Sequence, residues 1–282
     1  MGELNVRGTS RQVRHAAASP WLDRAERLGY VVRGLLYGVM GLLAFQVALG
    51  VGGRAVDQRG GLLYLTQNAG GKVALAIAVV GLAAYAVWGG VRAVFDPVGR
   101  GTSPAGLVQR LAYLWSGLSY AVIVLFGLQL LVGATNVDVQ QDSVQTAVAG
   151  LLRRPAGGWL TVVAGAVAIA GGIAQVVEAF RAGFRRDLKR YQMSEAEREA
   201  TDLVGRLGYV GRGVTFAVVG WFLVQAGLHH DAGQAHGYGG AFTFLLAQPI
   251  GRQLLGATAI CFMALGLHSF AYARWARTLA SR

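Results

Sequence analysis

The chain has 282 residues, of which 54% are hydrophobic, 14% are charged and 42 are glycines. Because a soluble domain carries roughly 25% charged residues, this composition excludes an ordinary soluble enzyme or binding domain and indicates an integral membrane protein. The single cysteine, Cys261, excludes an intrachain disulfide.

The N-terminal segment is polar and contains several arginines, with no apolar stretch ahead of the Ala16-Ala17-Ala18 tract. We therefore expect no cleavable signal peptide. Six apolar runs follow, each about 20 residues long and so long enough for a helix to cross roughly 30 Å of hydrocarbon. They lie near residues 31–51, 73–94, 111–132, 159–177, 207–228 and 254–273. The pattern predicts six transmembrane helices.

The first, third and fifth runs open on a repeated phrase that ends in Gly-Tyr or Ala-Tyr. The three copies are Arg27-Leu28-Gly29-Tyr30, Arg110-Leu111-Ala112-Tyr113 and Arg206-Leu207-Gly208-Tyr209. Three residues after each tyrosine stands Arg33, Ser116 or Arg212, and a glycine follows it. A glutamine recurs at one fixed spacing after each opening arginine, at Gln46, Gln129 and Gln225. The chain is thus a triplicated two-helix module.

We predict five segments: an N-terminal tail (1–18), module one (19–98), module two (99–180), a charged linker (181–202) and module three (203–282). Each module enters and leaves the membrane on the same side, so the copies are parallel. The predicted fold is an all-α integral membrane protein in which three parallel two-helix repeats form a pseudo-three-fold bundle of six helices.

Cations are concentrated on one side of this topology. The termini and the two linkers between modules carry 18 of the 26 arginines and lysines, and the positive-inside rule then places both termini in the cytoplasm. The net charge of +12 indicates topology and attraction to anionic lipid headgroups rather than nucleic-acid binding. The tyrosines of the opening phrases and the arginines that end the second helices are expected to be interfacial anchors: Tyr30, Tyr113, Tyr209, Arg92, Arg181 and Arg274.

Two kinds of helix start are visible in the linkers. Ser19-Pro20 and Ser103-Pro104 suit an N-cap followed by a first helical residue and predict short interfacial lead-in helices. Ser194 and Glu197 form a capping box that starts a charged helix running into Arg206. The basic stretch 181–190 is either a membrane-surface helix or a solvated linker.

The chain resembles a family of bacterial membrane proteins known only as the domain of unknown function 1206 family. The resemblance rests on the Gly-Tyr-x-x-Arg-Gly openings at 29–34 and 208–213, Met193-Ser194 in the linker, and the Gly-Gly-Ala and Pro-x-Gly elements at 239–241 and 249–251. It covers about residues 20–278 and implies six spans in the bacterial inner membrane and no established activity. Module two departs from the pattern at Ala112 and Ser116.

The repeated polar residues each allow two interpretations. Arg33 and Arg212 either extend back to the interface or hold an intramembrane partner or anionic ligand. Gln46, Gln129 and Gln225 either fix helix packing or line an outer vestibule. The glycines of these spans are interpreted as positions of close helix contact.

Catalytic and metal-binding signals are weak. The spans carry no carboxylate at depth, and no hydrolase elbow, Walker loop or HExxH helix occurs. His229, His230 and His236 are interpreted as part of an outer polar loop, and the alternative is a zinc site. His268 is expected to hydrogen-bond within the bundle. We predict no enzyme activity, no cofactor and no metal.

Two functions remain open. The first is a non-catalytic scaffold or accessory subunit that binds lipids or another membrane protein through its basic inner surface. The second is a passive channel or carrier for a small anionic or neutral solute, with Arg33, Arg212 and the glutamines as polar contacts in the pseudo-three-fold centre.

Overall fold

A computed structural model describes residues 20–52, 57–66, 70–96, 101–133 and 143–276; the predicted tail 1–18 lies outside them. The described residues contain six long helices and no strand: α2 (Pro20–Leu49), α4 (Gly71–Phe95), α5 (Pro104–Leu131), α7 (Gly157–Arg181), α8 (Glu195–His229) and α10 (Gly251–Trp275). All six are long and apolar enough to span a membrane. The prediction of a six-span membrane protein is confirmed.

Each repeat also contains a short helix between its two long ones, which the sequence analysis did not predict. These helices are α3 (Gln58–Thr66), α6 (Ser143–Leu152) and α9 (Tyr238–Leu246). In α3, the Asp57 carboxylate accepts hydrogen bonds from the backbone N–H groups of Arg59 and Gly60, both at 3.0 Å. Such N-capping satisfies donors that have no partner inside the helix.

Two of the three predicted N-caps are confirmed, and the third, Ser19, lies outside the described residues. The Ser103 hydroxyl accepts from Gly106 N at 3.2 Å with Pro104 at the first helical position, and Ser194 and Glu197 form both bonds of a capping box. The lead-in segments are not separate helices, because α2 and α5 run without a break from their prolines into the apolar spans.

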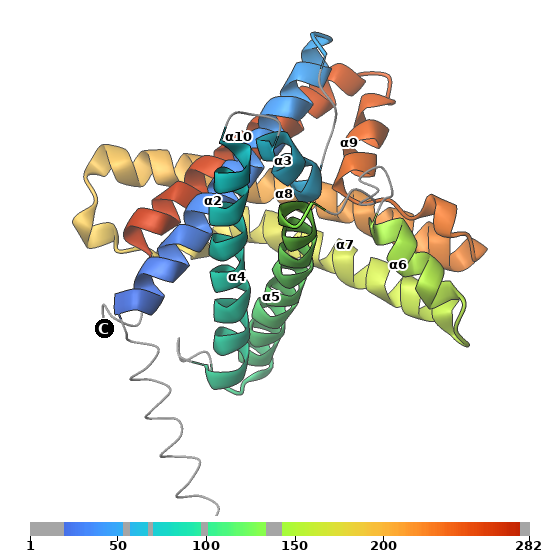
Figure 1. The fold of residues 1–282 in the computed structure, drawn as a ribbon, viewed down its shortest axis with the longest axis horizontal. Helices are drawn as coiled ribbons and strands as arrows, with labels where there is room; N and C mark the ends of the chain where they lie inside the picture. The colour runs from blue at the N-terminus through green and yellow to red at the C-terminus, as the bar shows by residue number, and fades with distance from the viewer. Residues whose placement is uncertain (1–19, 53–56, 67–69, 97–100, 134–142, 277–282) are drawn as a thin grey trace, which may run out of the picture.

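The long helices pair across the module boundaries (Figure 1). The most extensive contacts join α4 to α5, α7 to α8, and α10 to α2. In each pair the last helix of one repeat packs against the first helix of the next, and repeat three returns to repeat one. This cyclic order is what a pseudo-three-fold arrangement requires, and the three pairs run in different directions in Figure 1.

Contacts within a repeat are weaker and unequal. The helices of repeat one (α2 and α4) and of repeat three (α8 and α10) pack against each other. In repeat two, α5 and α7 make almost no contact over their described lengths. The predicted ring is therefore open on that side.

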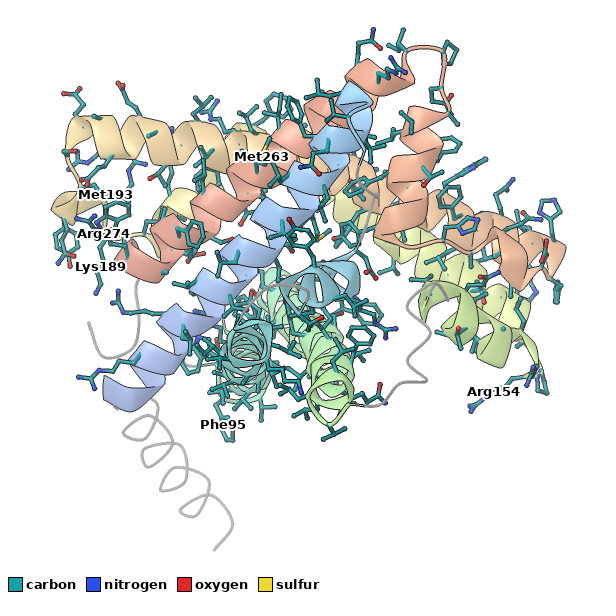
Figure 2. The ribbon with its side chains drawn as sticks, turned by 45° about the horizontal axis from the view of Figure 1, so that its top comes forward. Phe95, Arg154, Lys189, Met193, Met263 and Arg274 are labelled. Atoms are coloured by element: carbon teal, nitrogen blue, oxygen red, sulfur yellow. The ribbon has the colours of Figure 1, made fainter. Side chains whose placement is uncertain are left out.

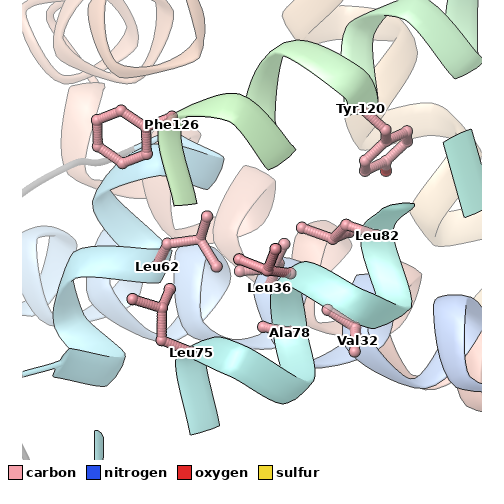
Figure 3. Close-up of a cluster of buried hydrophobic side chains, with 9 residues drawn as sticks. Val32, Leu36, Leu62, Leu75, Ala78, Leu82, Tyr120 and Phe126 are labelled. Carbon is pink, nitrogen blue, oxygen red and sulfur yellow. The ribbon is translucent and has the colours of Figure 1, made fainter. Parts of the chain in front are cut away.

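A buried apolar cluster joins the first repeat to α5 (Figure 3). Leu36 of α2, Leu62 of α3 and Leu82 of α4 are fully buried, and Tyr120 and Phe126 of α5 complete the cluster. The short helix α3 thus contributes directly to the core, which fixes α2, α4 and α5 relative to one another.

The basic stretch after α7 is neither a surface helix nor a solvated linker. It forms two short 3-10 turns, η1 (Gly183–Asp187) and η2 (Arg190–Gln192). Phe184 and Leu188 are buried at 1% and 0% exposure, and Lys189 N donates to the carbonyl of Trp275 at 2.8 Å. The segment therefore docks against the protein. Phe184 packs between Tyr209 of α8 and His268 of α10, and Leu188 packs with Tyr30 of α2 and Tyr272 of α10.

Candidate functional site

The glycine of each repeated opening lies against the backbone of the paired helix. A Cβ at Gly34 would lie 3.0 Å from the Gly266 carbonyl oxygen, one at Gly117 would lie 2.8 Å from that of Ala86, and one at Gly213 would lie 2.7 Å from that of Gly172. These three partners occupy the same position in their helices, counted from the first residue of α10, α4 and α7. The prediction that the glycines mark close helix contact is confirmed, and the repeat is preserved in the packing itself.

Arg33 of α2 is buried between three helices. Its Nε donates to the Ser269 hydroxyl of α10 at 3.3 Å, and its Nη1 donates to the Tyr85 hydroxyl of α4 at 2.7 Å. The guanidinium also lies 5.5–5.8 Å from the ring centres of Tyr30, Tyr37 and Tyr85. With 9% exposure, this side chain bonds inside the protein and does not extend to the interface.

Arg212 of α8 has the matching environment in repeat three. Its Nη2 donates to the side-chain oxygen of Gln175 in α7 at 2.6 Å, and its guanidinium lies 4.9 Å from the Tyr209 ring centre. Gln175 in α7 and Ser269 in α10 occupy the same position counted from the first residue of their helices. The two arginines therefore use equivalent acceptors in equivalent helix pairs.

Repeat two lacks both members of this interaction. Ser116 replaces the arginine, and Gly89, at the equivalent position of α4, replaces the acceptor. Ser116 and Gly89 instead line a small pocket together with Tyr85, Trp88, Arg92 and Tyr113. Arg92 forms an ion pair with Glu26 there. Ala112 is exposed, whereas Gly29 and Gly208 press on α4 and α10, so the departure at Ala112 follows from the missing α5–α7 contact.

Tyrosines connect the two arginines. The hydroxyls of Tyr37 and Tyr120 lie 3.3 Å apart, and the rings of Tyr85 and Tyr120 meet edge to face with centres 4.8 Å apart. The Tyr37 ring centre lies 5.8 Å from the Arg33 guanidinium, and its hydroxyl is in side-chain contact with Arg212. We call Arg33, Arg212, Tyr37, Tyr85 and Tyr120 the central cluster.

The central cluster carries two positive charges and no matching negative one. Neither guanidinium forms an ion pair with a carboxylate of the described residues. Arginine stays protonated in proteins, and burying an ion costs several kcal/mol unless it is compensated. Cation–π contacts return about 0.5–2 kcal/mol each. The cluster is thus the part of the described chain where polar chemistry is most concentrated inside the membrane-spanning helices.

The three glutamines differ in exposure. Gln46 and Gln225 are half-buried, and Gln129 is exposed on α5. The glutamine layer therefore stays a prediction.

The predicted anchors fall into two groups. Tyr30 is buried at 3% exposure between the rings of Tyr85 and Tyr272, so it packs in the protein instead of lying at its surface. Tyr113 and Tyr209 are half-buried, and Arg181 and Arg274 are exposed. Figure 2 shows Arg274 beside Lys189 at one end of the molecule.

Two of the three opening arginines, Arg27 and Arg110, have a role that the sequence analysis missed. Arg27 donates to the carbonyls of Ala273 and Arg274, both at 2.9 Å. Arg110 donates to the carbonyls of Ala93 and Val94 at 2.8 and 2.9 Å. Each arginine thus holds the C-terminal end of its paired helix, where carbonyls lack partners and the helix dipole favours a cation.

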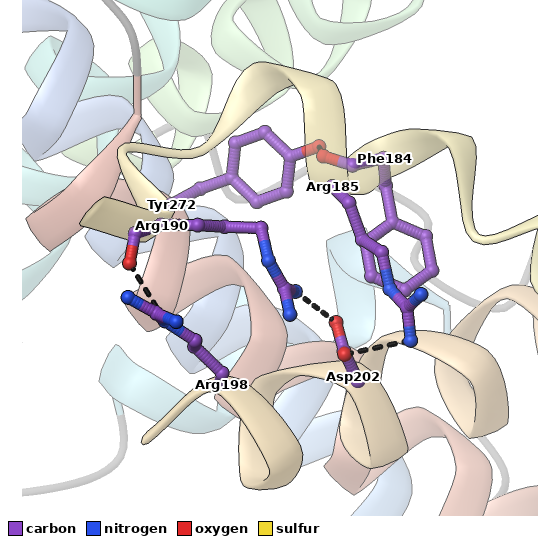
Figure 4. Close-up of polar contacts among 6 residues, drawn as sticks. All are labelled: Phe184, Arg185, Arg190, Arg198, Asp202 and Tyr272. Carbon is purple, nitrogen blue, oxygen red and sulfur yellow. Dashed lines mark hydrogen bonds and ion pairs between the residues drawn. The ribbon is translucent and has the colours of Figure 1, made fainter. Parts of the chain in front are cut away.

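The linker is fixed by carboxylate–arginine contacts (Figure 4). Asp202 of α8 forms ion pairs with Arg185 at 2.7 Å and Arg190 at 2.6 Å. Arg198 donates to the Arg190 carbonyl at 2.8 Å, and the Tyr272 hydroxyl donates to the Phe184 carbonyl at 3.4 Å. These bonds explain why the stretch 181–190 does not behave as a membrane-surface helix.

The histidines form no metal site in the part of the chain that the structure describes. His229 contacts the Gln225 carbonyl at 2.9 Å. The His268 ring is buried, and the backbone of Thr201 is its nearest hydrogen-bonding group. Aromatic rings surround this imidazole at centre distances of 4.9–5.9 Å.

Comparison with known proteins agrees with the triplicated architecture. The family model described as Domain of Unknown Function (DUF1206) matches residues 28–96, 111–182 and 207–276. The chain is 31% identical over 250 residues to "Uncharacterized protein YxxB" of Bacillus subtilis (strain 168), which covers 89% of this chain and 90% of that protein. No solved structure matches the chain.

These matches confirm the resemblance seen in the opening phrases. Each matched segment corresponds to one repeat, which consists of two long helices consecutive in the chain and the short helix between them. The chain therefore belongs to the family of the Domain of Unknown Function (DUF1206).

Proposed function

We propose that the protein is a non-catalytic scaffold of the bacterial inner membrane whose arginine-rich end faces the cytoplasm and binds anionic lipid headgroups. The observation that carries this proposal is a division among the arginines at that end. Arg27, Arg110 and Arg185 are used by the protein itself. Others remain exposed around the linker, namely Arg24, Arg181, Arg186, Arg206 and Arg274.

The exposed arginines come from helix ends that the packing gathers together. Arg181 ends α7, and Arg206 lies on α8, to which α7 is paired. Arg274 ends α10 and lies 4.0 Å from Glu197 near the start of α8. Each cation near an anionic membrane surface contributes about 1 kcal/mol. Several of them on one end favour a lipid headgroup as the ligand of this surface.

The transport alternative has less support. It requires the arginines and the glutamines to converge. Arg33 and Arg212 share Tyr37 as a neighbour, whereas Gln129 is exposed on α5. Within the helix pairs, glycines press on backbone atoms of the partner helix, which leaves little room for a conduit between paired helices. A scaffold whose interior is packed and whose charged end is exposed fits these contacts better.

Native mass spectrometry tests the lipid proposal. The protein is purified in mild detergent and supplied with equal amounts of phosphatidylglycerol and a zwitterionic lipid. We expect retention of phosphatidylglycerol to weaken more than tenfold in R181Q/R186Q/R206Q, because each charge contributes about fivefold. The matched control, K72Q/R153Q/R154Q, removes three exposed cations elsewhere and should retain the lipid. Equal retention by both variants, or a stoichiometric protein partner in place of lipid, would contradict the proposal.

A further inference from the structure

We propose that the central cluster is an intramembrane binding site for a small oxyanion, held between Arg33 and Arg212 with tyrosine hydroxyls as additional donors. The first observation is the charge. Two permanently protonated guanidinium groups lie among helices that span the membrane, and intramembrane charges of this kind are usually paired or functional.

The rest of the chain shows how this protein treats its other arginines. Arg92 is paired with Glu26, and Arg185 and Arg190 share Asp202. Arg110 and Arg198 bond to backbone carbonyls, but both lie near helix ends. Arg33 and Arg212 also bond to neutral oxygens, but they lie within the membrane-spanning helices, where an unbalanced charge is more costly.

The two arginines also share one neighbouring side chain. Tyr37 is a neighbour of both: its ring centre lies 5.8 Å from the Arg33 guanidinium, and its hydroxyl is in side-chain contact with Arg212. Like charges repel more strongly in a low-dielectric interior than in water. An anion between them converts this repulsion into two attractive interactions.

Hydrogen-bond donors remain for such a ligand. A guanidinium carries five N–H donors; Arg33 uses two of its nitrogens and Arg212 uses Nη2 in the bonds described above. The Nε of Arg212 is buried without a partner among the described residues. The Tyr85 hydroxyl accepts from Arg33 and therefore has its own proton to donate.

The donor geometry favours an oxyanion over a halide. Guanidinium groups bind carboxylate, phosphate and related anions through two parallel N–H···O bonds, whereas a halide offers a single centre. The ligand must be small, because the glycines that follow each arginine, Gly34 and Gly213, lie against Gly266 and Gly172. These contacts bring the backbones of α2 and α10, and of α7 and α8, together directly beside the cluster, so that no ligand fits between the paired helices there.

The repeats indicate one shared site rather than three. Repeat two has Ser116 in place of the arginine and Gly89 in place of its acceptor, but it contributes Tyr120, which contacts Tyr37 and Tyr85. Repeats one and three supply the charges, and repeat two supplies a hydroxyl. One anion per chain is the expected stoichiometry.

Equilibrium binding of labelled phosphate, sulfate and acetate to the purified protein tests this site, at constant ionic strength with chloride as the balancing salt. We expect saturable binding of at least one oxyanion at one per chain, with no competition by chloride. Native mass spectrometry of the same sample identifies the source, since a free ion and the phosphate of a retained phospholipid differ in mass. The absence of saturable binding of all three probes would overturn the proposal.

Variants separate the site from general folding. R212K keeps the charge but loses the planar fork, and we expect at least tenfold weaker binding. Y37F keeps the buried ring and loses only the hydroxyl, so it tests the same site if arginine variants fail to fold, with an expected loss of about fivefold. The controls R154Q and Y64F alter exposed residues and should bind as the unmodified protein does. Undiminished binding in folded R212K and Y37F would refute the site.

Discussion

The α7·α8 pair and the α4·α5 pair occupy equivalent places in the repeat, yet they are held together in different ways. In α7·α8, glycine faces glycine three times, at Gly158 and Gly227, Gly165 and Gly220, and Gly172 and Gly213. A Cβ added at any of these six positions would lie 2.5–2.9 Å from the carbonyl oxygen of the facing glycine.

The α4·α5 pair has one such contact. Gly89 and Gly117 lie against each other, but a Cβ at Gly127 would meet the Val79 side chain rather than backbone. Val79 stands where α7 has Gly165 and α10 has Ala259, counted from the first residue of each helix. Side chains therefore separate α4 from α5 where backbones meet in α7·α8. The difference shows that one repeat can be packed either by backbone contact or by side-chain contact.

The difference extends to the polar residues. Where backbones approach closely, α7 presents Gln175 to Arg212 of α8. In the α4·α5 pair, Ser116 has replaced the arginine and Gly89 the acceptor. Close backbone packing and a buried arginine thus occur together in the α7·α8 and α10·α2 pairs. In the α4·α5 pair, the backbone contact is less extensive and the arginine is absent.

The largest expected effect comes from filling a glycine contact in α7·α8. Gly165→Leu forces a side chain against the Gly220 carbonyl and Val224, and overpacking of this kind costs about 3 kcal/mol. Thermal unfolding in detergent measures the change. Gly171→Ala, on the same helix with its nearest neighbour atom at 3.9 Å, is the control and should shift stability by less than about 1 kcal/mol. Equal shifts for both variants would show that the glycine contacts do not hold the pair.

Removing the acceptor of Arg212 should have the next largest effect. Gln175→Ala leaves a charged donor without its 2.6 Å bond, and an unsatisfied buried donor costs about 1–3 kcal/mol. Ser269→Ala removes the longer, 3.3 Å bond of Arg33 and should cost less, since Tyr85 still accepts from that arginine. Thermal unfolding midpoints of the two variants, measured under the same conditions, test this order. A lower midpoint for Ser269→Ala than for Gln175→Ala would contradict it.

Much of this architecture follows from sequence. The six apolar runs predict the long helices, and Gly34, Gly117 and Gly213 are recognisable as packing positions from the repeat. Their partners are not, because periodicity defines a helix face but does not say which helix covers it. The pairing of each module with the next, and not chiefly with itself, therefore emerges only from the structure.

The arginines of the central cluster are predictable from the sequence, but most of its tyrosines are not. Arg33 and Arg212 stand out as charges within apolar runs, but the tyrosines that join them come from helices far apart in the chain. A signal existed, because Tyr37 and Tyr120 stand at the same spacing after the tyrosine of an opening phrase, with Phe216 at the third position. Tyr85 has no such counterpart, and only packing of α4 against α2 brings it to Arg33.

The smallest expected effect tests whether an arginine compensates for the looser packing of α4·α5. Arg110 donates to the carbonyls of Ala93 and Val94 at the end of α4, whereas its counterpart Arg206 is exposed on α8. Arg110→Gln should lower the free energy of unfolding by about 1 kcal/mol, since two hydrogen bonds are lost and a partly solvated one contributes about 0.5 kcal/mol.

Arg206→Gln is the matched change in the α7·α8 pair. It should leave the free energy of unfolding within about 0.5 kcal/mol of the value for the unmodified protein. Hydrogen exchange at the C-terminal turn of α4 then separates a local from a global effect, because a lost clamp releases that turn first. If both variants unfold alike and the α4 turn stays protected, the arginine is not what secures α4·α5, and the apolar contacts of Val79 and its neighbours must suffice for that pair.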